Sequence, residues 1–143
     1  MITKPSEYTT ITTLLFAEPF NRHLPPGLFQ VLTGAGDAGK QLVEHKHTNM
    51  VAFTGSVPTG QAIAAKCGQM MKPTLIETSG NDPFIVMPSA PIDVVARGAA
   101  FSAYMNCGQI CVSAERFFVH EAVHDEFVEK LAEHARAIRV GNG

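Results

Sequence analysis

The stretch Met50-Val51-Ala52-Phe53-Thr54-Gly55-Ser56-Val57-Pro58 joins a short apolar run to a glycine turn and to a proline that suits the first turn of a helix. We predict a strand over residues 50–53 and a helix over residues 58–69. Thr74-Leu75-Ile76 then supplies a second apolar run. A strand, a helix and another strand in this order predict a βαβ unit with parallel strands.

The rest of the chain continues this alternation of strands and helices. Further strands are expected at residues 28–32, 84–87 and 116–119, and further helices at residues 40–44, 93–105 and 122–138. A helix over residues 9–17 should end before Pro19, because proline lacks the N–H group that a helix interior needs. The whole pattern predicts an α/β protein with a mainly parallel sheet and flanking helices.

Composition and charge exclude several classes of protein. The 143 residues are 45% hydrophobic and 17% charged, which is typical of a globular domain. A net charge of −2 gives no attraction to nucleic acid or to an anionic membrane. The apolar run Leu14-Leu15-Phe16-Ala17 is too short for a membrane span or a signal peptide. Three cysteines make no disulfide framework, so we expect a reducing compartment, the cytoplasm.

Two segments bring together the side chains that acyl transfer through a thioester requires. Tyr104-Met105-Asn106-Cys107-Gly108-Gln109-Ile110-Cys111 presents a thiol at the end of a glycine-containing loop. Leu75-Ile76-Glu77-Thr78-Ser79-Gly80-Asn81 presents a carboxylate after an apolar run. In such chemistry a thiolate attacks a carbonyl carbon and a carboxylate later activates water.

In their order and spacing, these segments resemble the cysteine and glutamate signatures of the aldehyde dehydrogenase superfamily. The resemblance implies a Rossmann-like parallel sheet, with part of a dinucleotide-binding region over residues 1–77 and the start of a catalytic domain over residues 78–143. It also implies NAD-dependent oxidation of a small-molecule aldehyde to a carboxylic acid. Cys111 would form a thiohemiacetal and then a thioester, and Glu77 would activate the water that hydrolyses the thioester. The presence of Glu77 favours hydrolysis over acyl transfer to coenzyme A.

The turn after the strand at residues 50–53 is a candidate phosphate site. A glycine turn at a helix start lets backbone N–H groups and the positive end of the helix meet a phosphate. Taken alone, such a turn is more often a structural connector. Beside Glu77 and Cys111 it resembles the phosphate turn of the family, which implies a cofactor role for Gly55, Ser56 and Gly60, with Ser56 against the pyrophosphate.

Two further segments are candidates for contact with the dinucleotide. Gly34-Ala35-Gly36-Asp37-Ala38-Gly39 matches the Gly-x-Gly-x-x-Gly fingerprint, but the acidic residue expected about 20 positions later is missing. We therefore expect a loop beside the cofactor, with Gly34 in it, more than a direct phosphate site. The resemblance also implies that Lys4 hydrogen-bonds the adenosine ribose and that Glu7 binds its 2′-hydroxyl. A carboxylate there would repel a 2′-phosphate, so NAD is favoured over NADP.

Two other interpretations of the sequence remain open. His120-Glu121-Ala122-Val123-His124 matches the zinc peptidase motif, in which both histidines lie on one helix. Here it follows an apolar run, so we expect His120 to end a strand, and we predict no metal. The other interpretation is a truncated, non-catalytic module, because the chains of the family are several-fold longer. The missing parts would include an oxyanion-hole asparagine, a nicotinamide-ribose motif and the oligomerisation segment.

The remaining cysteines are expected to have packing roles. Cys67 lies on a predicted helix and should be buried as a small apolar side chain. Cys107 precedes Cys111 by four residues. We expect it to pack near the site, with a redox partnership with Cys111 as the alternative.

Overall fold

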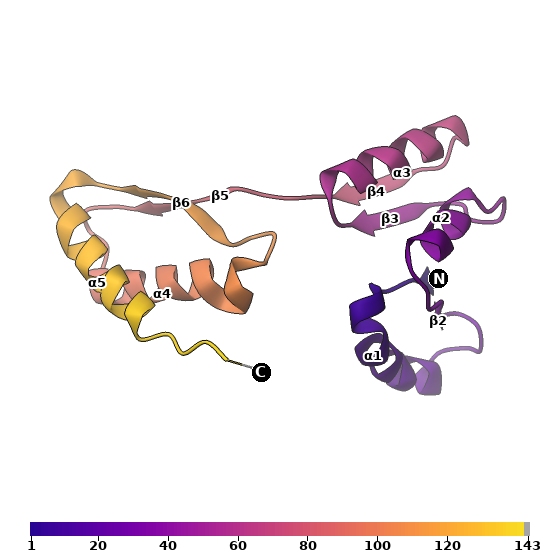
Figure 1. The fold of residues 1–143 in the computed structure, drawn as a ribbon, viewed down its shortest axis with the longest axis horizontal. Coiled ribbons are helices and arrows are strands. Elements are labelled where there is room, and N and C mark those ends of the chain that lie inside the picture. The colour runs from indigo at the N-terminus through magenta and orange to yellow at the C-terminus, as the bar shows by residue number, and fades with distance from the viewer. Residues whose placement is uncertain (142–143) are drawn as a thin grey trace. The chain divides into compact units, whose positions relative to one another are not determined.

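Three pairs of parallel strands organise residues 1–141, and a helix connects the two strands of each pair (Figure 1). The computed structural model describes residues 1–141. The pairs are β1 (Ile2–Thr3) with β2 (Gln30–Val31), β3 (Val51–Thr54) with β4 (Thr74–Glu77), and β5 (Asp82–Val86) with β6 (Ala114–Val119). The connecting helices are α1 (Thr10–His23), α3 (Val57–Gln69) and α4 (Ile92–Tyr104). The predicted alternation of parallel strands and helices is therefore confirmed, with the strands in three two-stranded ladders.

The other helices complete the order of elements. They are α2 (Gly36–Glu44), α5 (His124–Arg136) and the short 3₁₀ helices η1 (Glu7–Thr9), η2 (Met105–Gly108) and η3 (Glu121–Val123). The helix predicted at residues 40–44 starts four residues earlier, within the glycine-rich segment. The one predicted at residues 122–138 is divided into η3 and α5. Among residues 1–141, no helix has the length and apolar character needed to cross a membrane.

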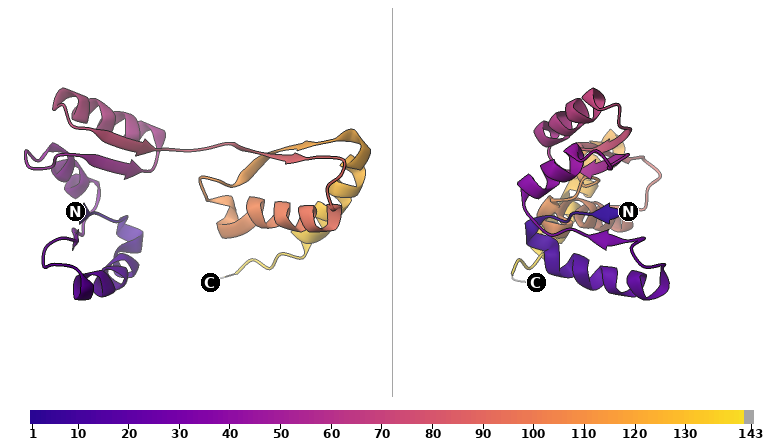
Figure 2. Two further views of the ribbon diagram at one scale, coloured as in Figure 1. Left: turned by 180° about the vertical axis from the view of Figure 1, so that it is seen from behind. Right: turned by 90° about the vertical axis from the view of Figure 1, so that its right-hand side faces the viewer.

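The chain divides into two compact units, Met1–Glu77 and Thr78–Gly143. In the first unit, α3 runs alongside the β3–β4 ladder, as both figures of the whole chain show (Figures 1 and 2). Cys67 on α3 has no solvent exposure, so its predicted burial is confirmed. Lys72, which lies between α3 and β4, connects this region to the C-terminal end of α2. Its Nζ donates to the carbonyl groups of Val43 and His45 at 2.7 and 2.8 Å.

The core of the second unit lies between the β5–β6 ladder and the helices α4 and α5. Phe127 of α5 is its largest fully buried side chain, and it packs with Val86, Ile92, Ala96 and Ala99. The ring centroids of Phe117 and Phe127 are 6.1 Å apart. Alanines on α4 let α5 approach closely, which explains why the predicted Ala- and Val-rich helix is the buried one.

Helix α1 contains Pro19, which corrects the prediction that this helix ends before the proline. The missing N–H leaves the Leu15 carbonyl without its helical partner, but Leu15 is 65% exposed and water can satisfy that group. Contacts across the proline hold the final turn in place. The Phe20 ring packs on the ring of Phe16, with centroids 5.0 Å apart, and on the ring of Phe29, directly before β2, with centroids 5.6 Å apart. Tertiary packing has therefore overridden a local helix-breaking residue.

Replacing Pro19 by alanine should raise the stability of the first unit. In a helix interior, proline is about 3 kcal/mol less favourable than alanine. Proline also stabilises the folded state by about 1 kcal/mol, because it lowers the conformational entropy of the unfolded chain. We therefore expect Pro19→Ala to raise the free energy of unfolding by about 2 kcal/mol. Urea titration followed by circular dichroism measures it. Pro26→Ala is the matched control. Pro26 is the second residue of a turn in which the Leu28 N–H donates to the Pro25 carbonyl at 3.1 Å. Proline is favourable at this position of a turn, so Pro26→Ala should lower the free energy of unfolding. An equal effect of both variants would contradict the prediction.

Candidate active site

The candidate phosphate turn and Glu77 lie at the same end of the β3–β4 ladder. Thr54 and Glu77 are register partners, and the Gly55 N–H donates to the Glu77 carbonyl at 3.1 Å. A Cβ atom at Gly55 would come within 2.5 Å of the Phe53 ring, so any other residue there would require this ring to move. Ligands of open α/β sheets bind beyond the carboxyl ends of the parallel strands, which is where these residues lie.

Ser56 is the N-cap of α3. Its Oγ accepts the Thr59 N–H at 3.4 Å and lies 2.9 Å from Thr59 Oγ1. The Gly60 N–H donates to the Ser56 carbonyl at 2.9 Å, and Gly60 is buried. The exposed Ser56 hydroxyl therefore lies at the positive end of a 13-residue helix, where an anion is stabilised.

Lys4 and the glycine-rich loop meet beyond the carboxyl ends of β1 and β2. Lys4 Nζ donates to the Gly34 carbonyl at 2.9 Å and to the Pro5 carbonyl. Because an ammonium group carries three N–H donors, one remains for a ligand. Gly34 has φ +149°, and a Cβ there would lie 2.6 Å from the Ala38 Cβ. Glu7 is exposed at the start of η1. These observations bring Lys4 and Gly34 together and leave the Glu7 carboxylate accessible.

Cys111 lies on an irregular loop between α4 and β6. Asn106 and Cys107 have φ of 52° and 57°, in the left-handed region that L-residues rarely adopt. The Asn106 side-chain amide donates to the Gln109 carbonyl, and the Gln109 N–H donates to the Asn106 carbonyl, both at 3.1 Å. Ser113 is buried, and its Oγ has no hydrogen-bond partner among the residues described. Cys111 is exposed and forms no disulfide.

The segment that follows Glu77 packs against the Cys111 loop within the second unit. A Cβ atom at Gly80 would lie 2.5 Å from the Cys111 carbonyl oxygen, so only glycine fits without a backbone shift. Arg116 Nε donates to the Asn81 carbonyl at 2.9 Å. Asp82 and Ala114, the first residues of β5 and β6, are register partners. The segment that leads into β5 and the loop that leads into β6 therefore reach the ladder at the same end. Residues 80–81 are therefore held against the Cys111 loop and the start of β6 within the second unit.

Gly80, Arg116 and Asn106 shape the Cys111 loop and are not among the functional residues predicted from the sequence. The sequence offered a signal only for Asn106, because asparagine is the residue other than glycine that most readily adopts the left-handed conformation. Gly80 and Arg116 act through partners more than 30 positions away in the chain. Local pattern carries no information about such pairs.

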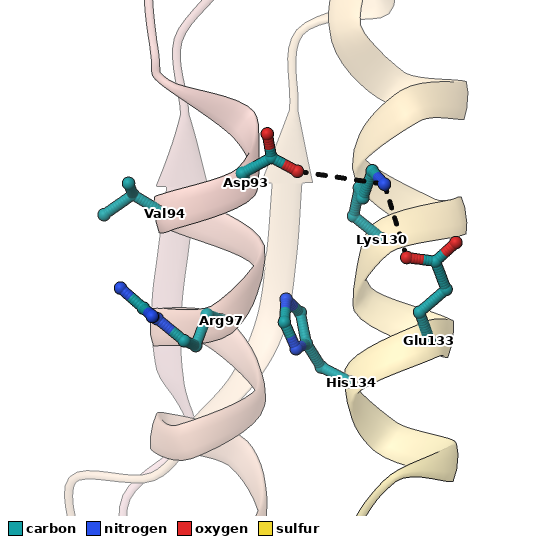
Figure 3. A pocket seen from close by; sticks show the side chains of 6 residues that line it. All are labelled: Asp93, Val94, Arg97, Lys130, Glu133 and His134. Carbon is teal, nitrogen blue, oxygen red and sulfur yellow. Dashed lines mark hydrogen bonds and ion pairs between the residues drawn. The ribbon is translucent and has the colours of Figure 1, made fainter.

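An open hollow between α4 and α5 lies apart from these signatures (Figure 3). Its lining residues are Asp93, Val94, Arg97, Lys130, Glu133 and His134. The Glu133 hydrogen bond and the charges of Glu133 and Asp93 raise the pKa of Lys130 above 10.5. A raised lysine pKa stabilises the fold below pH 10.5, and the effect is lost only as the pH rises through the raised value. The hollow is therefore an ion-paired helix surface, lined by neither Glu77 nor Cys111.

The zinc peptidase geometry is not formed at His120 and His124. His120 follows β6 directly, as predicted, and its Nδ1 accepts the Ala122 N–H at 3.2 Å as the N-cap of η3. His124 begins α5 and pairs with Asp125 at 2.8 Å. The two histidines therefore do not share a helix face. Within residues 1–141, no three histidine, cysteine or acidic side chains gather as metal ligands.

Comparison with known proteins identifies the family. The model of the aldehyde dehydrogenase family matches residues 1–143. A betaine aldehyde dehydrogenase from Brucella ovis is 41% identical over 142 residues, which cover 99% of this chain and 29% of that protein. The crystal structure of gamma-glutamyl-gamma-aminobutyraldehyde dehydrogenase from Burkholderia cenocepacia matches with a TM-score of 0.90 and 38% identity, over 99% of this chain and 29% of that one.

A second structure, an NAD-dependent aldehyde dehydrogenase from Sinorhizobium meliloti, matches with a TM-score of 0.91 and 38% identity, over 99% of this chain and 28% of that one. The chain therefore belongs to the aldehyde dehydrogenase family, and the predicted α/β fold class is confirmed. It spans less than a third of the length of the relatives that it matches.

Proposed function

We propose that this chain supplies the nucleophile, the hydrolytic base and part of the dinucleotide site of an aldehyde dehydrogenase that oxidises an aldehyde to a carboxylic acid. The observation that carries the proposal is the packing of Gly80, three residues after Glu77, against the backbone of Cys111. This contact lies within the second unit and fixes the stretch just after Glu77 on the loop that carries the thiol. Both side chains are exposed, as groups that meet a substrate must be.

In the proposed mechanism, Cys111 Sγ attacks the aldehyde carbon and forms a thiohemiacetal. Lys4, Gly55, Ser56 and Gly60 would hold NAD, which would supply the hydride acceptor for this carbon, and Cys111 would then carry a thioester. The Glu77 carboxylate then takes a proton from water as the water attacks the thioester carbon. The carboxylic acid leaves, and the Cys111 thiolate is restored.

The proposed dinucleotide site combines the loops beyond β1, β2 and β3. Gly55, Ser56 and Gly60 would meet the pyrophosphate at the start of α3, supported by the accessible N-cap hydroxyl and the helix dipole. Lys4 would donate its remaining N–H to the adenosine ribose, next to the Gly34 loop. The exposed Glu7 carboxylate would accept from the 2′-hydroxyl and repel a 2′-phosphate, which favours NAD over NADP. One structural relative is named as NAD-dependent.

We infer a cytoplasmic location from the cysteines. All three are free thiols, and two of them are exposed. Exposed thiols persist in a reducing compartment.

Glu77→Gln separates the two halves of the proposed reaction. The amide cannot accept a proton, so thioester hydrolysis should slow by about 10²–10⁴-fold while the attack by Cys111 continues. Rapid mixing of the purified protein with NAD and a panel of aldehydes should then show a burst of one NADH per site, followed by slow turnover. If the Glu77→Gln variant lost both the burst and the steady-state turnover, the role of Glu77 as the base would be contradicted. A folded wild-type protein without any turnover would support the non-catalytic module instead.

Gly80→Ala tests the contact that carries the proposal. The new Cβ would lie within 2.5 Å of the Cys111 carbonyl oxygen and 3.0 Å of Asp82 Oδ2, so the nucleophile loop must move. A misplacement of about 1 Å can lower kcat about 10²-fold, which is the loss expected in steady-state assays. Gly98→Ala is the matched control, because its Cβ would meet no atom within 4 Å on α4. It should keep full kcat, and an equal loss in both variants would contradict the steric argument.

A further inference from the structure

Two exposed thiols share the loop between α4 and β6. We propose that Cys107 and Cys111 form an intramolecular disulfide when a hydroperoxide oxidises this loop, which makes the pair a reversible oxidation site. The pair consists of residues four positions apart, joined by Gly108, Gln109 and Ile110. The two sulfurs are the only groups of the protein that react with the hydroperoxide, so the proposal does not depend on aldehyde oxidation.

Solvent access distinguishes this pair from the third cysteine. Cys107 and Cys111 are exposed, whereas Cys67 has no exposure on α3. The prediction that Cys107 has a packing role is therefore wrong, because its side chain faces solvent where packing would have buried it. Oxidation of a thiol requires contact with the oxidant, so the two loop thiols are open to a hydroperoxide and Cys67 is shielded.

The loop folds back on itself around both cysteines. The Gln109 N–H donates to the Asn106 carbonyl at 3.1 Å, and the Ser113 N–H donates to the Ile110 carbonyl at 3.0 Å. Each cysteine is thus the second residue of a hydrogen-bonded turn. A disulfide needs Cα atoms about 4.4–6.8 Å apart, far less than the reach of an extended segment of this length. Because two successive turns fold the segment back, the two cysteines lie in one compact loop, and their Cα atoms need to move less than in an extended segment to reach disulfide distance.

The backbone around Cys107 can rearrange at low cost. Cys107 and Asn106 both have left-handed φ, which costs about 1–2 kcal/mol per residue for an L-amino acid. A shift of Cys107 to an ordinary φ releases that cost and offsets the loss of the Asn106–Gln109 hydrogen bonds. The change of loop conformation that a disulfide requires should therefore cost little free energy.

The reaction proceeds in two balanced steps. The Cys111 thiolate attacks the outer oxygen of the hydroperoxide, the O–O bond breaks, and an alcohol or water leaves with a proton, so that Cys111 becomes a sulfenic acid. Cys107 sulfur then attacks Cys111 sulfur, the S–S bond forms and the S–O bond breaks. The departing hydroxide takes the proton of the Cys107 thiol and leaves as water. In total, two electrons pass from the thiols to the hydroperoxide, and a dithiol reverses the change.

One consequence rests on the proposed function. A disulfide occupies Cys111 sulfur, so aldehyde oxidation should stop while the bond is present and resume after reduction. The formation of the bond is measured by mass, and it therefore stands or falls independently of turnover.

Peptide mapping of the purified protein tests the proposal directly. The protein is reduced, freed of reductant, treated with hydrogen peroxide, and its remaining thiols are blocked before digestion with trypsin. Cleavage after Arg97 and Arg116 places both loop cysteines in the peptide 98–116, apart from Cys67. We expect the peptide 98–116 to be lighter by two hydrogens and to carry no blocking group. After treatment with dithiothreitol it should regain two thiols. Cys67 should remain a thiol that the blocking reagent modifies.

Cys107→Ser provides the matched control, since it removes the second thiol without touching the nucleophile. In this variant, hydrogen peroxide should convert Cys111 to the sulfinic acid, which dithiothreitol does not reverse. Its oxidised peptide should therefore be heavier. A wild-type peptide with a sulfinic acid on Cys111 and an intact Cys107 thiol would overturn the proposal, as would a disulfide that includes Cys67.

Discussion

Cys111→Ala is expected to lower kcat for aldehyde-dependent NADH formation by at least about 10⁴-fold, because no other group can carry the thioester. The side chain is exposed, so its truncation removes little packing, and the fold should remain intact. Circular dichroism and urea titration check the fold, and NADH absorbance checks the turnover. Unlike Glu77→Gln, this variant should also show no burst, since the first covalent step itself is lost.

The other two cysteines supply the controls for this variant. Cys67→Ala removes a fully buried sulfur from α3 and should lower stability by about 1 kcal/mol while the folded protein keeps its kcat. Cys107→Ala changes an exposed residue and should keep both stability and kcat in reducing buffer. Full turnover in Cys111→Ala, or a loss as large in either control, would contradict the assignment of Cys111 as the nucleophile.

Phe127→Ala is expected to destabilise the second unit by about 3–5 kcal/mol, which is a large part of the 5–15 kcal/mol that stabilises an ordinary domain. Phe127 is only 1% exposed and touches the ring of Phe117 and the buried residues of β5 and α4. Its loss leaves a cavity between α5 and the β5–β6 ladder that the stiff strands cannot fill. The free energy of unfolding from urea titration measures the effect.

Phe101→Ala is the control for the loss of the same side-chain volume. Phe101 lies on α4 in the same unit but is 65% exposed, and alanine favours a helix. We expect a change within about 0.5 kcal/mol. Similar losses in the two variants would mean that the core of this unit lies elsewhere.

Much of the fold could be predicted from the sequence where local pattern and structure agree. The strand at residues 50–53, its glycine turn and the helix that follows correspond to β3, the Gly55 turn and α3, because an apolar run, a glycine and an early proline each have a local physical meaning. Prediction failed at Pro19, where the aromatic contacts of Phe20 outweigh the lost hydrogen bond. It also failed at Cys107, because burial cannot be inferred from a sequence position next to a reactive residue.

By itself, the sequence determined the order of strands and helices and the family resemblance, since each of these depends on short segments. It also supplied Cys111 and Glu77 as the candidate thiol and carboxylate. Only the tertiary structure decided which distant residues meet. It joins Gly80 to Cys111, Asn81 to Arg116, and Lys4 to Gly34. These partners lie about 30 positions apart, and each pair forms only because two parallel strands fix its register. No local periodicity encodes such pairing, because it arises when the strands and their connecting helix pack together.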